Sequence, residues 1–301
     1  MKTILITGGS GLIGSKLSLA LIAKGYQVRH LSRQPNHPAL IKSYNWDIEN
    51  NSIDENAFEG VDTIIHLAGA GIAEKKWTKK RKAEIVNSRV NSTQLLFDYV
   101  QKMNLPVETF LAASATGIYP NSPHKIYNEN AKPATNFLGD CCEKWENKID
   151  QFTTIGIRTV KLRTGIVLSK NGGALSKMAK PILAGIGAPI GDGKQWMSWI
   201  DEDDLVNMYL FALENKSLNG AYNAVSPQPC SNQNFTQVLA KVLNRFILLP
   251  KIPSFVIRLL LGEMSIIVLS STKVSAEKII ATGFKFNFEK LTESLTKIYH
   301  E

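Results

Sequence analysis

A glycine-rich run near the start of the chain could bind the phosphates of a nucleotide. TGGSGLIG covers Thr7 to Gly14, and its glycines include three that are spaced three residues apart. The run follows an apolar strand pattern and opens a helix pattern, which is the context that a dinucleotide-binding turn requires. Without Cβ atoms the chain can turn tightly and approach a pyrophosphate, which the amides of the helix N-terminus then bind. We therefore predict a dinucleotide site formed by Gly8, Gly9, Ser10, Gly11, Leu12, Ile13 and Gly14.

The residues about twenty positions further on indicate which dinucleotide is bound. An NAD site places an acid after the second strand for the ribose 2′-hydroxyl, whereas an NADP site places a cation there for the 2′-phosphate. This chain has VRHLSR, which ends in Ser32 and Arg33 with no acid nearby. An arginine after a strand can be a plain surface residue, but Arg33 can also hold a phosphate in a bidentate fork. The sequence thus favours NADP(H).

Other clusters of reactive side chains lack the spacing of a metal or nucleophile site. Cys141 and Cys142 are adjacent in NFLGDCCEKWE, and Cys230 is distant in sequence. A vicinal disulfide would distort a helix, and the pair has no further ligands at metal-binding spacing. The acids Asp201 to Asp204 do not have the pattern of a calcium loop and fit the start of a helix. We predict no metal site.

Composition and charge narrow the class of protein. The 301 residues are 44% hydrophobic and 20% charged, which is typical of a globular protein. The apolar run at residues 3–6 stops at the glycines, so we predict no secretory leader, and three cysteines favour a reducing, cytoplasmic compartment. Phe255 to Leu269 is apolar but interrupted by charges, which predicts a buried or interfacial helix and no membrane partner.

The net charge of +9 raises the question of an anionic partner. Six positive charges lie in KKWTKKRK, Lys75 to Lys82. This run could be a nucleic-acid patch with Trp77 as a stacking platform, or a solvated helix face near a phosphate. Because no nucleic-acid module is recognisable elsewhere, we favour the solvated face.

Alternating strand and helix patterns position the glycine run. Strands are predicted at residues 3–7, 27–32, 63–68, 109–114 and 159–168, and helices between them at 12–24, 83–103 and 136–149. Further helices are predicted from about 203, at 231–243 and at 288–298. Strands separated by helices indicate an α/β fold with a Rossmann-type, doubly wound parallel sheet. We predict a cofactor domain at 1–168, to which 200–226 returns, and a smaller C-terminal α+β lobe formed by 169–199 and 227–301.

Several motifs resemble those of one enzyme family. TGGSGLIG, HLAGAG (His66–Gly71) and SATGIYP (Ser114–Pro120) are similar to extended short-chain dehydrogenases/reductases of the epimerase/dehydratase type. Four more stretches resemble the atypical, YfcH-like NAD(P)-dependent epimerase family: KWTKKRKAEIVNSR (Lys76–Arg89), GGALSKM (Gly172–Met178), GDGKQWMSWIDEDDL (Gly191–Leu205), and LLLGEM (Leu259–Met264) followed by GFKF. The matches cover nearly the whole chain.

This resemblance implies further cofactor residues. It places Leu67, Ala68 and Gly69 at the end of a strand against the adenine ribose and the pyrophosphate. It places Glu84 and Arg89 near the cofactor, and Val167 close to the nicotinamide. The chain departs from the family at Asp201, where a histidine is usual.

The resemblance also exposes a missing proton relay. Reductases of this superfamily use a tyrosine and a lysine four residues later, because a nearby ammonium lowers the pKa of the phenol. None of the eight tyrosines here has such a lysine, and alignment to the family puts Phe137 and Cys141 at the two positions. Ser114, which keeps its strand position, and Tyr119 are the remaining catalytic candidates, although Tyr119 could equally pack over the cofactor.

Two functions are therefore expected. The first is an NADP(H)-dependent oxidoreductase-like or epimerase-like enzyme that has altered acid–base groups and acts on an unknown small-molecule substrate. The alternative is a non-catalytic NADP(H)-binding redox sensor or regulatory protein. A nucleic-acid binder is less favoured than either.

Overall fold

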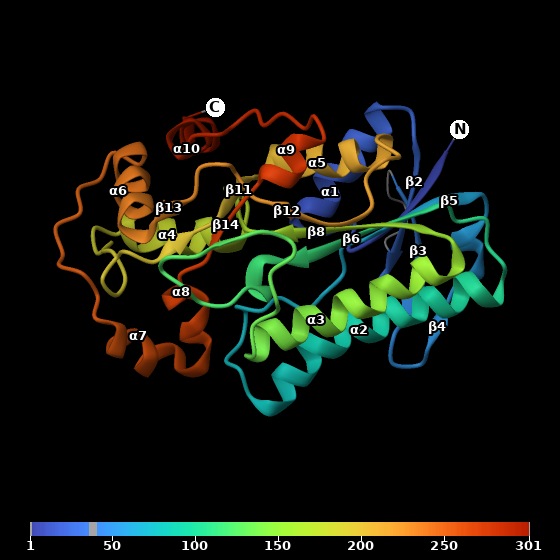
Figure 1. Ribbon diagram of the computed structural model, residues 1–301, viewed down its shortest axis with the longest axis horizontal. Coiled ribbons are helices and arrows are strands. Elements are labelled where there is room, and N and C mark those ends of the chain that lie inside the picture. Colours follow the sequence, from blue (N-terminus) through green and yellow to red (C-terminus); the bar gives the residue numbers. More distant parts are fainter. Residues whose placement is uncertain (1, 36–40, 301) are drawn as a thin grey trace.

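An eight-stranded sheet forms the centre of the computed structural model, which describes residues 2–35 and 41–300 (Figure 1). The strand order is β12-β8-β6-β5-β1-β2-β3-β4. All pairs are parallel except β4 with β3. The strands are β1 Thr3–Thr7, β2 Gln27–Ser32, β3 Lys42–Asp47, β4 Ser52–Ile53, β5 Val61–His66, β6 Thr109–Ala115, β8 Arg158–Thr164 and β12 Gly220–Ala224.

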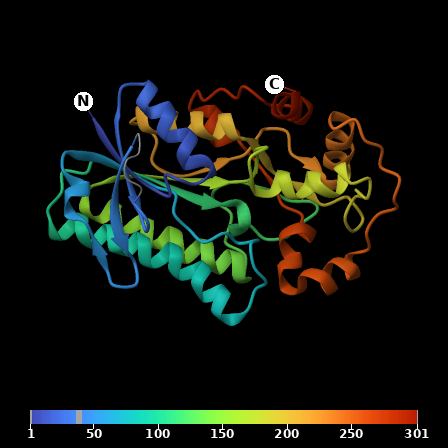
Figure 2. The same cartoon turned by 180° about the vertical axis from the view of Figure 1, so that it is seen from behind.

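Helices cover both faces of this sheet. α1 (Leu12–Ala23) and α5 (Glu202–Glu214) lie over one face, and α2 (Lys79–Lys102) and α3 (Phe137–Asp150) lie over the other (Figures 1 and 2). Side chains alternate along each strand, so Ile4 packs into the core under α1 and α5 while Leu5 packs into the core under α2 and α3. Burial on both faces explains why all five residues of β1 are apolar or threonine and none is exposed.

The second lobe has its own core around Trp199, Phe235 and Leu295. The helices that contribute to this core are α4 Gly173–Leu183, α6 Asn232–Val242 and α10 Leu291–His300, and its short strands are β9 Ile166–Leu168, β10 Trp196–Met197, β11 Trp199–Asp201 and β13 Cys230–Ser231. The remaining helices after α6 are α7 Ser254–Leu261, α8 Ile266–Leu269 and α9 Glu277–Ala281. α9 and β14 Lys273–Val274, which pairs with β7 Ile126–Tyr127, pack instead into the core under α1 and α5. Four 3-10 turns complete the order: η1 Glu55–Phe58, η2 Thr116–Ile118, η3 Gln151–Ile155 and η4 Gly262–Ser265.

The structure confirms the predicted fold class and most of the predicted elements. β1 and β2 have the predicted bounds, and α3 begins and ends one residue later than predicted. The predicted strand 159–168 is instead two strands that part at Gly165, where the backbone passes so close to Ser198 that a Cβ atom would lie 2.5 Å from its carbonyl oxygen. β8 stays in the central sheet, while β9 pairs with β11 in the second lobe. β3 was not predicted.

The segment Phe255–Leu269 also differs from its prediction. It does not form one helix but α7, η4 and α8. Of the two predicted alternatives, a buried or an interfacial helix, burial does not hold for Phe255, Leu259 and Leu260, which are 69%, 82% and 60% exposed. None of the helices in residues 2–35 and 41–300 combines the length and the apolar character that crossing a membrane needs.

Candidate cofactor site

The glycine run forms a tight turn between β1 and α1. Gly8 has a φ of +71°, a left-handed conformation that favours glycine, and the Gly11 amide donates a hydrogen bond of 3.0 Å to the Gly8 carbonyl. A Cβ atom on Gly14 would lie well under 3.0 Å from the same carbonyl oxygen, and one on Gly9 would overlap the ring of His30 from β2. The turn therefore requires glycine at these positions because of the backbone and a neighbouring ring.

The N-terminus of α1 opens onto a cavity. The cap residue is Gly11, which has no side chain to occupy the free amides, and the first turn contains no acid. A cavity of about 470 Å³ borders this turn and α1, with the loop before α4 and the start of α5 on its other side; it is lined by Ser10, Gly11, Leu12, Ser15, Lys16, Leu19, Asn171, Gly172 and Glu202. Free amides and the helix dipole at an open N-terminus favour an anionic group such as a pyrophosphate.

The end of β5 is held directly against the glycine turn. The amides of Leu67 and Ala68 each donate to the Thr7 hydroxyl over 3.2 Å, and that hydroxyl lies 2.7 Å from His66 Nδ1. Burial, followed by the charge of Arg89, lowers the pKa of His66 to about 3. The neutral ring can therefore accept a hydrogen bond from the Thr7 hydroxyl, and this contact holds the ends of β1 and β5 together.

Arg89, a residue of α2, contacts the backbone that follows β5. Its guanidinium donates to the Ala70 carbonyl over 3.0 Å, packs against Gly69 and lies 5.2 Å from the centre of the Trp145 ring. Leu67, Ala68, Gly69 and Arg89 thus gather at the carboxyl ends of β1 and β5, where open α/β sheets bind their ligands.

Ser32 and Arg33 follow the neighbouring strand, β2, at the same edge. The Ser32 hydroxyl donates to the Gln34 carbonyl over 3.0 Å, which closes a short turn after the strand. Arg33 is exposed, and among the described residues it forms no ion pair. β2 pairs directly with β1, with Leu31 opposite Thr7, so Arg33 lies two residues beyond the position next to the start of the glycine turn.

Glu84 and Val167 are placed differently. Glu84 forms an ion pair of 2.7 Å with Arg81, and Arg81 donates to the Gly71 carbonyl, so Glu84 reaches the loop after β5 only through Arg81. Val167 is the middle residue of β9, half-buried and paired with Ile200, and the loop that follows β9 leads to the cavity wall at Gly172.

The basic run Lys75–Lys82, which extends into the first turn of α2, makes several contacts within the protein. The Trp77 indole donates to the Ile72 carbonyl over 2.8 Å and its ring meets Phe137 edge to face at 4.8 Å. Arg81 is buried, and Lys82 forms an ion pair with Glu263. Trp77 is therefore not a free stacking platform for a nucleic-acid base.

The two relay positions contain no proton-transfer pair. Phe137 is the first residue of α3, and Cys141 lies one turn later and is buried. Burial raises the pKa of the Cys141 thiol, and the nearby charge of Arg89 offsets only part of that rise. A cation thus lies near the position of the usual lysine, but it comes from α2 and its neighbours are thiols rather than a phenol.

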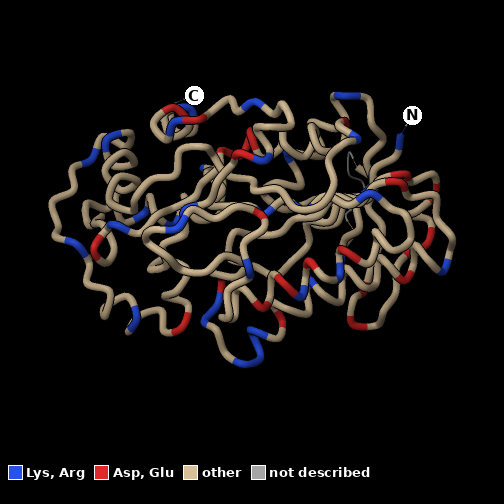
Figure 3. The backbone as a smooth tube through the Cα atoms, in the orientation of Figure 1, with Lys and Arg blue, Asp and Glu red and all other residues tan. Residues whose placement is uncertain are grey.

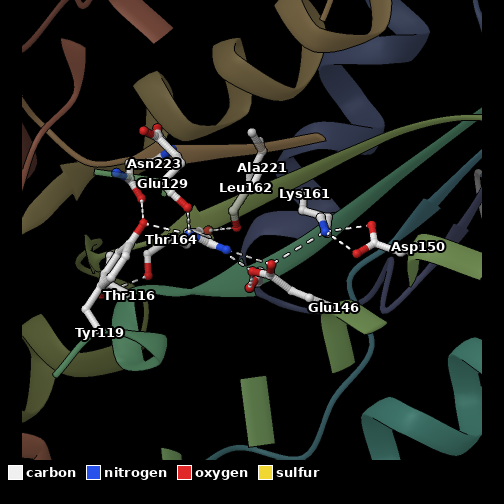
Figure 4. Close-up of polar contacts among 12 residues, drawn as sticks. Thr116, Tyr119, Glu129, Glu146, Asp150, Lys161, Leu162, Thr164, Ala221 and Asn223 are labelled. Carbon is white, nitrogen blue, oxygen red and sulfur yellow. Dashed lines mark hydrogen bonds and ion pairs between the residues drawn. The ribbon is translucent and has the colours of Figure 1, made fainter. Parts of the chain in front are cut away.

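Tyr119 lies in a buried hydrogen-bond network that also contains Glu146 and Asn223 (Figure 4), and Ser114 joins this network through Glu146. The Ser114 hydroxyl donates to Glu146 over 2.6 Å, and Arg163 donates to both oxygens of Glu146 over 2.8 and 2.9 Å. The Tyr119 hydroxyl donates to Asn223 over 2.6 Å and accepts from Arg163 over 2.9 Å. Burial raises the pKa of Tyr119 to about 12 although Arg163 opposes it, so the phenol keeps its proton at neutral pH. The hydroxyls of Ser114 and Tyr119 are therefore both already hydrogen-bonded within the protein.

This network was not predicted from the sequence. Lys161 donates to Asp150 over 2.6 Å and lies 3.5 Å from Glu146, so two cations of β8 meet two acids of α3. The available signal was RTVKLRT, in which Lys161 and Arg163 are two apart in an otherwise buried strand and so share one face. Buried charges of this kind need partners.

The acidic run caps a helix, as predicted. The Asp201 carboxylate accepts from the Asp203 amide at the start of α5 over 2.8 Å and also bonds Ser294 and Lys297. Within the part of the chain that the structure describes, no group of three or more histidine, cysteine or acidic residues is arranged to hold a metal. Cys141, Cys142 and Cys230 are free, buried thiols.

A doubly wound parallel sheet with a glycine turn at its first strand–helix connection defines a Rossmann-type dinucleotide-binding protein. Residues 4–224 match the model of the NAD dependent epimerase/dehydratase family, and residues 252–298 match a domain of unknown function, DUF1731. The chain belongs to the NAD-dependent epimerase/dehydratase family, within the extended short-chain dehydrogenases/reductases, as its motifs indicated.

Its relatives and structural neighbours are consistent with this assignment. An epimerase family protein of Staphylococcus saprophyticus is 39% identical over 308 residues, and one of Staphylococcus aureus is 36% identical over 307; each match covers 100% of both chains. Human epimerase family protein SDR39U1, solved with NADPH, is 29% identical, with a TM-score of 0.88 and 99% of each chain covered. UDP-glucuronic acid 4-epimerase of Bacillus cereus, solved with UDP-glucuronic acid and NAD, shares the fold at 19% identity, with a TM-score of 0.80 and 99% and 98% of the two chains covered.

Proposed function

We propose that this protein binds NADP(H) in preference to NAD(H). The pyrophosphate would lie on the N-terminus of α1, and the 2′-phosphate would lie against Arg33. The observation that carries the preference is the exposed Arg33 at the end of β2, beside the glycine turn, where an NAD site would have an acid. The NADPH in the human neighbour supports the same choice.

The remaining contacts of this proposed site follow from the geometry. Leu67, Ala68 and Gly69 would border the adenine ribose and pyrophosphate, because their backbone is held against the turn. Arg89 would supply the cation that ordinary reductases take from the relay lysine. Glu84 would act indirectly, by holding Arg81 against the loop after β5.

We further propose that the bound cofactor exchanges hydride with a small molecule. The support is a cavity of about 220 Å³ in the second lobe, next to α4. It is lined by Lys177, Met178, Pro181, Ile182, Ile186, Gly187, Ala188, Ile190, Asn232, Phe235, Thr236, Leu239, Ile252 and Val268. α4 connects it to the cofactor side, because the start of α4 lies so near α1 that a Cβ atom on Gly173 would be 3.6 Å from the Leu12 side chain. Mostly apolar walls with few polar groups are typical of a small-molecule site.

A non-catalytic NADP(H) sensor is the second candidate function. The observation that favours it is the absence of a titrating donor at the relay positions, where Phe137 and Cys141 stand, together with the engagement of Ser114 and Tyr119 in the buried network. Such a protein would keep the binding site and respond to the redox state of the cofactor pool without turnover.

The cofactor preference is tested by replacing Arg33. Arg33→Ala should raise the Kd for NADPH about 10- to 100-fold, which corresponds to the loss of one charge-assisted contact, and leave the Kd for NADH nearly unchanged. Thermal shifts with each cofactor measure this difference. Arg245→Ala, which removes an exposed arginine of the second lobe, is the matched control. Equal shifts with NADPH and NADH in the unmodified protein would refute the preference.

The role of Tyr119 is tested by Tyr119→Phe. We expect a loss of about 1–3 kcal/mol in the free energy of unfolding, because Asn223 and Arg163 each lose a buried partner. We expect no change in NADPH consumption per folded molecule across a panel of carbonyl compounds and sugar nucleotides. A tenfold or greater fall in kcat with unchanged stability would show instead that Tyr119 is the proton donor. If no compound is turned over by the unmodified protein, the sensor function is favoured.

A further inference from the structure

One end of the second lobe exposes many large apolar side chains. The chain between α6 and α7 runs along the end of the long axis opposite the N-terminus in both Figure 1 and Figure 2. Phe246 and Leu248 in this chain, and Leu259 in α7, are 84%, 80% and 82% exposed. Arg245 donates to the Leu183 carbonyl, which brings the end of α4 to the same chain. We give the name apolar end to the exposed apolar residues of these segments, which are Leu183, Ile186, Phe246, Leu248, Leu249, Phe255, Leu259 and Leu260. Groups of exposed large apolar side chains often mark an interaction site.

In α7, one side of the helix packs on the protein and the other sides expose apolar residues. Ile257 faces the protein and is 7% exposed, whereas Phe255, Leu259 and Leu260 on the other sides of the same helix face solvent. Pro250 and Pro253 fix the approach of the chain to the helix. The outward side of this short helix therefore carries three large apolar residues beside the exposed Arg258, which a helix at a plain water-facing surface does not require.

The charged residues in the chain around the apolar end are mainly positive. From residue 241 to residue 262 the chain has four cations, Lys241, Arg245, Lys251 and Arg258, and no acid. All four cations are exposed. The flanking acids are Asp192 and Glu263, and Glu263 is paired with Lys82. Figure 3 shows the blue positions spaced along this end of the backbone.

We propose that the apolar end binds the surface of an anionic lipid bilayer. Apolar side chains that project beside lysine and arginine can enter the boundary between headgroups and acyl chains while the cations meet lipid phosphates. This is binding in the plane of the surface. The length criterion that predicted no membrane partner from the sequence concerns only segments that cross the bilayer. The inference is independent of the cofactor site.

A second copy of the chain is the main competing occupant, and charge disfavours it. A symmetric contact would bring the same surface of each copy together, so four cations of one chain would face four of the other. The net charge of +9 per chain adds to this repulsion. A bilayer of anionic lipid instead offers charges of the opposite sign.

Sedimentation of the full chain with vesicles tests the proposal. We expect binding to vesicles of phosphatidylcholine mixed with phosphatidylglycerol, little binding to phosphatidylcholine alone, and release at high salt. Arg245→Ala combined with Arg258→Ala should lower the partition coefficient roughly twentyfold, and Phe246→Ser combined with Leu259→Ser by at least as much. Lys125→Ala combined with Lys132→Ala, and Ile126→Ser, change exposed residues elsewhere and should bind as the unmodified chain does.

Three results would overturn the proposal. The first is no binding, or equal binding to neutral and anionic vesicles. The second is binding that the Phe246 and Leu259 substitutions leave unchanged. The third is dimerisation in lipid-free buffer that these substitutions abolish, because it would assign the apolar end to a second copy. The thermal shift with NADPH is measured on every variant. An unchanged shift shows that the variant is folded and that its cofactor site is intact, so a change in vesicle binding is not caused by a change in cofactor binding.

Discussion

Gly14→Ala should abolish NADPH binding. A Cβ atom at this position would lie well under 3.0 Å from the Gly8 carbonyl oxygen and under 3.0 Å from Gly9 Cα, and both contacts are to backbone that cannot rotate away. The turn would have to open, which displaces the α1 amides that the pyrophosphate is proposed to use. We expect the Kd for NADPH, measured by titration calorimetry, to rise at least 100-fold, about 2.7 kcal/mol.

Gly117→Ala is the control for this substitution. Its nearest neighbour would be Leu138 Cβ at 3.5 Å, an ordinary contact, so NADPH binding should be close to that of the unmodified chain. Circular dichroism of Gly14→Ala must show a folded protein for the comparison to count. A folded Gly14→Ala that binds NADPH within a few-fold of the unmodified affinity would mean that the glycine turn does not hold the cofactor.

Glu146→Ala should cause the largest loss of stability. The Glu146 carboxylate is 5% exposed and is the partner of Arg163, of Lys161 and of the Ser114 hydroxyl. Its removal leaves two buried cations without that charge, and breaking a buried ion pair in this way costs about 3–5 kcal/mol. Urea unfolding measures the change, and Glu143→Ala, on the exposed side of the same helix, is the control. A loss below about 1 kcal/mol would show that the network is not a stabilising element.

The same carboxylate gives the protein an acid-sensitive component of stability. Burial alone would raise the pKa of Glu146, but the hydrogen bonds and charge of Arg163, with Lys161 and Ser114, outweigh it and hold that pKa below its usual value. Because the folded state favours the charged form, this contribution is present above the pKa of the unfolded chain and is lost as the pH falls through the folded value. The free energy of unfolding should therefore decline in that acidic window in the unmodified chain and decline less in Glu146→Ala.

Local features of the sequence predicted the fold and the candidate cofactor site. The glycine turn depends on contacts within residues 7–14, and Arg33 is identified by its place directly after a strand, so both are visible without tertiary information. β1 was predicted with its bounds because an apolar strand that is buried on both faces shows as a short apolar run. β2, QVRHLS, was also predicted with its bounds although it contains polar residues.

The rest of the site could not be predicted because it depends on contacts between residues that are far apart in sequence. Ser114 and Glu146 are 32 residues apart, and Tyr119 and Asn223 are 104 apart, so the sequence could not show that both hydroxyls are already bonded. The break at Gly165 depends on the Ser198 carbonyl, which arrives from another lobe. β3, KSYNWD, was missed although its polar and apolar residues alternate as in a half-buried strand, because the pattern contains only two apolar side chains, Tyr44 and Trp46.

A crystal structure of the protein with NADPH tests the central claim most directly. We predict the pyrophosphate at the N-terminus of α1, within hydrogen-bond distance of the amides of residues 11–13, and the 2′-phosphate against the guanidinium of Arg33. A dinucleotide that lies away from the glycine turn, or a 2′-phosphate that points into solvent with Arg33 turned aside, would contradict the proposed site and its preference for NADP(H).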